Sequence, residues 1–241
     1  MTPRTAINPA WAALLTDGPL ALGYDVATTQ RGTSNPSAVT VLQREGRMVF
    51  GRLVLSWKTR DPAVARAVLG CVLDDIETAG QKARRLVIDA SSEKYYAADV
   101  RASLARRCPV ELVSGNQKLK FRNEEMDAKS LLGNLYCAAL EDGLLLLPAG
   151  DWIALDHRLV KREAGRFVTD LGPGGEHGDT FDAAKLAYWG LQSGGTVAAH
   201  AAQVGDFTGA GSGSAASLRN RPGLIGPIGG GRRFAPLSTK F

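Results

Sequence analysis

Short runs of hydrophobic residues alternate along the chain with polar, turn-forming stretches. Three of these runs, at residues 20–27, 38–43 and 48–57, are rich in β-branched or alternating apolar residues. The connections between them are short and rich in turn-forming residues, so three consecutive antiparallel strands are predicted. A fourth run, at residues 84–89, ends in a continuous apolar stretch, which is typical of a parallel strand buried on both faces.

Apolar residues at helical spacing lie between and after these strands. Asp61 and Pro62 form the cap and first turn of a predicted helix that Gly80 ends. Further helices are predicted at about residues 94–107, 124–142 and 179–191, with another helical stretch between residues 147 and 166. Short strands are predicted at residues 110–114, 144–147 and 166–169. The order βββαβαβα predicts an α/β fold with a mixed sheet flanked by helices.

Both ends of the chain lack this periodicity. Residues 1–18 carry little pattern beyond a short apolar run, and we interpret them as an arm or the remnant of a linker. Residues 194–241 are rich in Gly, Ser, Ala and Pro and predict a flexible basic tail. The predicted domain is therefore residues 19–193.

Composition narrows the class of protein. The 241 residues are 44% hydrophobic and 22% charged, as in globular proteins, and no uninterrupted apolar run has the length of a membrane span. The sequence indicates neither a secretion signal nor a disulfide framework. Since it also has no membrane span, we expect no membrane association. The net charge is +5, but residues 194–241 alone carry +4. Nucleic-acid binding must therefore depend on local basic clusters or on the tail.

Three aspartates lie within, at the end of or at the start of predicted elements, at positions that a mixed sheet brings together. Asp25 lies in the first predicted strand, Asp89 ends the fourth and Asp179 opens the last helix. Converging carboxylates repel one another unless divalent cations, which prefer oxygen ligands, neutralise them. Two such ions about 4 Å apart activate water and stabilise the leaving oxygen of a phosphodiester. Taken singly, each aspartate is also compatible with a turn or a helix cap.

The motifs GYDVA around Asp25, VIDAS around Asp89 and HGDTFDAAKLAYW around Asp179 resemble the acidic motifs of the nuclease domain of tailed-phage large terminase subunits. The resemblance covers roughly residues 20–192. It implies a ribonuclease H-like sheet of five or more strands and an Mg²⁺- or Mn²⁺-dependent endonuclease, with two bound ions, that cuts concatemeric viral DNA. By this likeness Asp25, Asp89 and Asp179 are metal ligands. Asp182 is the rival of Asp179 for the third position.

One part of a complete large terminase is missing from the sequence. The phosphate-binding loop GxxxxGK[ST] does not occur, so no ATP site is predicted. The chain is expected to be either the nuclease part of a longer protein or a separately encoded subunit. The resemblance implies double-stranded DNA, a packaging ATPase domain, a small terminase subunit and the portal as partners, in the host cytoplasm.

A basic segment after the predicted strand at 110–114 is the candidate DNA-binding element. Lys118, Lys120 and Arg122 alternate there, and Lys129 follows on the next predicted helix. Such residues would contact DNA phosphates beside the metal ions, although a solvated basic loop has the same pattern. Two alternatives to a terminase nuclease remain. One is another ribonuclease H-like nuclease, such as a junction resolvase or a hybrid nuclease, and the other is a non-catalytic module that docks on DNA or the portal.

Overall fold

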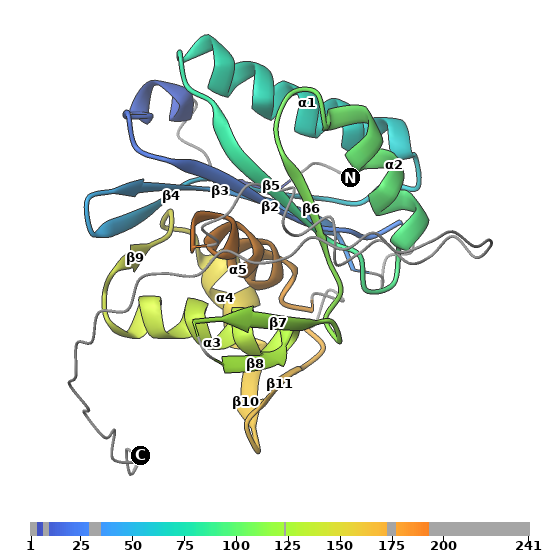
Figure 1. The fold of residues 1–241 in the computed structure, drawn as a ribbon, viewed down its shortest axis with the longest axis vertical. Helices are drawn as coiled ribbons and strands as arrows, with labels where there is room; N and C mark the ends of the chain where they lie inside the picture. The colour runs from blue at the N-terminus through green and yellow to red at the C-terminus, as the bar shows by residue number, and fades with distance from the viewer. Residues whose placement is uncertain (1–3, 7–9, 29–34, 123, 173–176, 193–241) are drawn as a thin grey trace, which may run out of the picture. The chain divides into compact units, whose positions relative to one another are not determined.

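A mixed β-sheet forms the centre of the protein, in a computed structural model that describes residues 4–6, 10–28, 35–122, 124–172 and 177–192 (Figure 1). The predicted tail therefore lies outside the described residues. The sheet order is β1-β4-β3-β2-β5-β6, and β9 also pairs with β4. The strands are β1 (Arg4–Ala6), β2 (Leu20–Asp25), β3 (Ser37–Glu45), β4 (Met48–Trp57), β5 (Ala83–Asp89), β6 (Val110–Val113) and β9 (Leu145–Leu146).

The directions of the strands match the prediction. The strand β3 is antiparallel to both β2 and β4, whereas β5 is parallel to β2 and β6 is parallel to β5. A tight turn at Gly46, where φ is +58°, joins β3 to β4. The sheet thus places β2 at the centre with β5 beside it, and the ribonuclease H-like α/β fold is confirmed.

Helices cover both faces of the sheet, as Figure 1 shows. On one face α1 (Pro62–Thr78) and α2 (Lys94–Leu104) bury a core with alternate strand residues, including Leu22, Leu86 and Ile88. On the other face α5 (Asp179–Gln192) and α3 (Ala128–Glu141) pack on residues such as Ala21 and Val87. The helix α4 (Asp151–Arg158) packs against α5. None of the helices in the described ranges has the length and apolar character needed to cross a bilayer.

The start of the predicted long helix at 124–142 is wrong. Residues 124–127 form the strand β8 (Glu124–Asp127), which pairs with β7 (Lys118–Phe121) in a hairpin, and α3 begins only at Ala128. The Asp127 side chain caps α3 by accepting a 2.8 Å hydrogen bond from the Ser130 amide. A second hairpin joins β10 (Val160–Glu163) to β11 (Arg166–Thr169).

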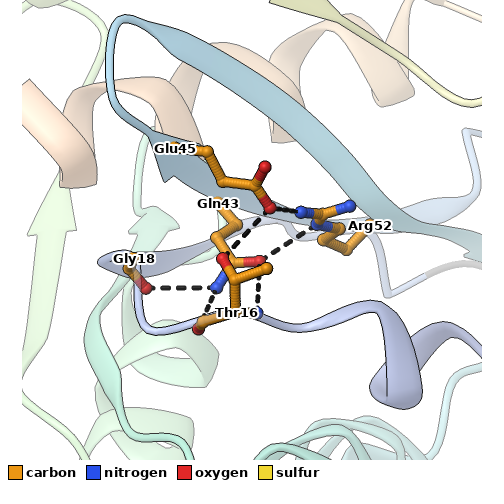
Figure 2. A network of polar contacts seen from close by, with 5 residues as sticks. All are labelled: Thr16, Gly18, Gln43, Glu45 and Arg52. Carbon is orange, nitrogen blue, oxygen red and sulfur yellow. Dashed lines mark hydrogen bonds and ion pairs between the residues drawn. The ribbon is translucent and has the colours of Figure 1, made fainter.

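Part of the predicted N-terminal arm packs on the domain. The strand β1 pairs with β4, and the 3₁₀ helix η1 (Trp11–Leu14) buries Trp11 in the core. Figure 2 shows how the segment before β2 is held. The buried Gln43 amide donates to the carbonyls of Thr16 and Gly18, at 2.7 and 3.1 Å, and accepts from Arg52. These contacts attach residues 16–18 to β3.

Candidate active site

The pleat of two neighbouring strands aims Asp25 and Asp89 toward the same helix. Successive strand residues point to opposite faces, so Asp25 shares the face of Ala21, and Asp89 shares that of Val87. The parallel register pairs Tyr24 with Ile88, one residue before each acid. Both carboxylates therefore lie at the same edge of the sheet, on the face that α5 covers.

Small residues let α5 lie directly on β2. A Cβ atom added to Gly23 would lie 1.9 Å from the carbonyl oxygen of Ala183 and 2.3 Å from the amide nitrogen of Ala187. Gly190 also lies close to the sheet, because its Cβ would lie 2.9 Å from the Cβ of Ala21. This close approach brings the polar face of α5 alongside Asp25. The sequence motif contains these small residues, but their role depends on the tertiary contact.

The carboxyl group of Asp25 lies in a strongly negative environment. Its pKa is raised well above the usual range, first by burial and then by the charges of Asp182, Asp179 and Asp89, while Lys185 acts in the opposite direction. All three acids from the sequence motifs, together with the rival Asp182, thus interact electrostatically at one place. Asp89 is held there by a 2.7 Å hydrogen bond from the Ser91 amide.

Asp179 and Asp182 occupy different surroundings. Asp179 is only 3% exposed, and burial, followed by the charge of Asp156, raises its pKa to about 8. Asp182 is half-buried, lines an open cleft together with Asp89, and exerts the largest charge effect on Asp25. Of the two candidates for the third ligand, Asp182 therefore faces the solvent-accessible side of the cluster.

Lys185 is a buried cation within the acidic cluster. Its Nζ forms an ion pair with Asp182 and lies 5.7 Å from the centre of the Phe181 ring. Burial opposes its charged form, but the carboxylates of Asp182, Asp25 and Asp89 outweigh this effect and raise its pKa. No pattern in the sequence indicates a role for this residue, which lies in an otherwise apolar stretch of the last motif.

Asp156 of α4 holds the first turn of α5, and nothing in the sequence marked it for this role. Its two carboxylate oxygens accept hydrogen bonds from the amides of Gly178 and Thr180, at 3.0 and 2.7 Å, and from the Thr180 hydroxyl. These donors would otherwise remain unpaired at the helix start. The side chain of the neighbouring His157 forms a 2.8 Å hydrogen bond with the Tyr136 hydroxyl. Burial lowers the pKa of this histidine. Thus α4 acts as a support behind the cluster.

Basic side chains surround the cleft above the acids. The cleft has a volume of about 840 Å³, and Asp89, Asp182 and Lys185 are among the residues that line it. Its basic wall consists of Lys94, Lys118, Lys129 and Arg166, all of which are exposed. Basic side chains thus line the same cleft as the acids Asp89 and Asp182.

The predicted DNA-binding residues are divided between the cleft and the outer hairpin. Lys118 and Lys129 line the cleft, whereas Lys120 and Arg122 are exposed on the hairpin outside its lining. On the same hairpin, the half-buried Phe121 ring packs edge-on against Trp189, with centroids 6.1 Å apart.

The side chains of the cluster offer the type of ligand atom that divalent cations prefer. Asp25, Asp89, Asp179 and Asp182 supply oxygen atoms alone, and Lys185 balances only part of their charge. Within the described ranges, however, the His, Cys, Asp and Glu side chains do not form a group of three or more gathered closely enough to hold an ion. Among the described residues, the candidate ligands therefore form a loose cluster and not a closed cage.

A mixed sheet of this order, with helices on both faces and acids at the ends of the adjacent strands β2 and β5, is a ribonuclease H-like fold. No protein-family model matches the sequence, and the search of curated proteins found no match. Comparison of the structure shows that the chain has the fold of a large terminase nuclease domain.

Three structures of one such domain illustrate the likeness. The large terminase nuclease from the thermophilic phage G20c superposes with a TM-score of 0.52 at 19% identity, covering 72% of this chain and 82% of the other. Its form with bound magnesium gives 0.52 at 17% identity, with the same coverage. The form with bound cobalt gives 0.51 at 17% identity and covers 72% and 81%. At these identities the likeness establishes the fold.

Proposed function

We propose that this protein is a metal-dependent DNA endonuclease, the nuclease domain of a large terminase that cuts concatemeric viral DNA during genome packaging. The observation that carries the proposal is the convergence of Asp89, Asp179 and Asp182 on Asp25, with Asp89 and Asp182 lining a cleft that basic side chains also line. The terminase nuclease fold and the magnesium and cobalt bound to the G20c domain support it.

Each part of the cleft has a role in this mechanism. Asp25, Asp89 and Asp182 would hold Mg²⁺ or Mn²⁺, with Asp179 as the alternative to Asp182. A bound divalent ion supplies Lewis-acid activation of water and of the phosphodiester. Lys118 and Lys129 hold the DNA backbone through its phosphates.

Outside the cleft, Lys120 and Arg122 on the hairpin extend the phosphate contacts along a double-stranded substrate. A packaging ATPase domain, a small terminase subunit and the portal are the proposed partners, and the host cytoplasm is the proposed location.

Cleavage of supercoiled plasmid tests the activity. The protein is incubated with Mg²⁺, Mn²⁺ or chelator, next to Asp25→Asn and Asp89→Asn. Asp75→Asn, an exposed carboxylate on α1 across the sheet, is the matched control. We expect nicking and linearisation that require metal and both cleft aspartates and that persist in the control.

The other outcomes separate the alternatives. Preference for a four-way junction or an RNA–DNA hybrid over linear duplex would identify a different ribonuclease H-like nuclease. DNA binding without cutting in any metal would favour a docking module instead.

A further inference from the structure

The ammonium group of Lys185 lies inside the acidic cluster itself. Lys185 is 8% exposed, and its Nζ contacts Asp182 one helical turn earlier on α5. The Phe181 ring covers it from another side, with its centre 5.7 Å away. A buried lysine requires a partner of opposite charge, and this one obtains it from a residue of the cluster.

Lys185 differs from the other basic residues of the cleft. Lys94, Lys118, Lys129 and Arg166 are exposed on the wall, whereas Lys185 is buried at the base, where Asp25 and Asp89 also act on it. Its position on the second turn of α5 is fixed by the packing of the same helix on Gly23 and Ala21. The fold therefore keeps this charge within reach of the cluster, because the helix that carries it is fixed on the sheet.

A divalent cation and this ammonium group require the same carboxylate. Oxygen ligands of a metal ion must be free to turn toward it, but one oxygen of Asp182 is already engaged by Lys185. A positive charge beside the site also repels an incoming cation.

We propose that Lys185 is the resident countercation of the acidic cluster, holding Asp182 in the metal-free protein and setting the affinity for the divalent ion that displaces it from that carboxylate. The inference rests on the proposed metal-dependent function. It assigns Lys185 two effects: the metal-free fold is stabilised, and metal binding is weakened.

The test is Mn²⁺ binding to Lys185→Met, measured by isothermal titration calorimetry on metal-free protein. Methionine fills the same space without the charge. We expect Mn²⁺ to bind this variant about tenfold more tightly, or better, than the wild type. The metal-free variant should also melt at a lower temperature and regain more in Mn²⁺ than the wild type. Lys82→Met is the matched control, because Lys82 is exposed at the opposite end of β5.

The outcomes distinguish the inference from the function. Equal or weaker Mn²⁺ binding by a folded Lys185→Met, while the wild type binds Mn²⁺, overturns the countercation role and leaves the nuclease proposal standing. Failure of both proteins to bind Mn²⁺ overturns both proposals. If Lys185→Met does not fold without metal, Lys185→Gln and refolding in Mn²⁺ give the same comparison. Rescue by Mn²⁺ then supports the inference, and no rescue contradicts it.

Discussion

The contact between Gly23 and α5 gives the most direct test of how the site is built. In Gly23→Ala the new Cβ would lie 1.9 Å from the carbonyl oxygen of Ala183, whereas such atoms do not approach within 3.0 Å. The helix must therefore withdraw by about 1 Å, because both close contacts are backbone atoms that cannot rotate away. Overpacking of this kind costs about 1–3 kcal/mol of unfolding free energy.

The same displacement should affect catalysis more strongly than stability. The residues Asp182 and Lys185 move with α5, while Asp25 and Asp89 remain on the sheet. A misplacement of about 1 Å in a catalytic group costs on the order of 100-fold in rate. We therefore expect Gly23→Ala to remain folded and to lose about 100-fold in metal-dependent plasmid cleavage.

Urea denaturation and initial cleavage rates check this reasoning, with Gly70→Ala as the control. Gly70 lies within α1, and its nearest contact to an added Cβ is the flexible Arg107 guanidinium at 3.8 Å. Alanine there should leave cleavage unchanged and stabilise the helix by up to about 1 kcal/mol. Wild-type stability and wild-type cleavage in Gly23→Ala would refute the argument that glycine is needed for the site.

Three further predictions concern the support behind the site and the core. Asp156→Ala leaves three hydrogen-bond donors at the start of α5 unpaired and should cost about 2–4 kcal/mol in urea denaturation; a loss below about 1 kcal/mol would contradict this role. Burial keeps the pKa of His157 in the folded protein below the value of about 6.5 in the unfolded chain. The contribution of the neutral imidazole to stability is therefore complete above that value and is lost as the pH falls below it. Thermal unfolding between pH 7.5 and 5.5 should therefore show a steeper loss in the wild type than in His157→Gln, and equal slopes would argue against a buried neutral imidazole. Maleimide should label the exposed Cys71 in native protein but not Cys108, whose pKa burial raises to about 11; mass spectrometry showing early Cys108 labelling would be inconsistent with the buried core.

The sequence predicted the sheet well because its signals are local. The apolar runs that became β2 to β5 are bounded by turn residues, and short connections leave few alternatives to antiparallel pairing. Residues 124–127 were predicted as helix because the stretch EEMD is polar and favours helix in isolation. Pairing with the hairpin partner overrides that preference, and it sets Lys118 opposite Asp127 and Lys120 opposite Glu125.

The candidate site was predictable only in part. Asp25 and Asp89 stand at strand ends, so their convergence follows from strand order and pleat. The roles of Asp156 and Lys185 depend on how α4 and α5 pack, and neither residue stands in a pattern that announces such contacts. The metal-ligand role of Asp179 or Asp182 stays a prediction, and so do the DNA contacts.

The outer side of β4 is shared by two short strands from distant parts of the chain. The strand β1 pairs with Val54–Ser56, and β9 pairs with Val49 and Phe50. An uncovered edge strand exposes backbone groups that recruit strands from other molecules and so promote aggregation. Residues 4–6 therefore protect solubility as well as completing the sheet, and a chain shortened beyond Ala6 would carry a self-association surface along half of β4. Any truncation meant to isolate the folded domain should begin before Arg4.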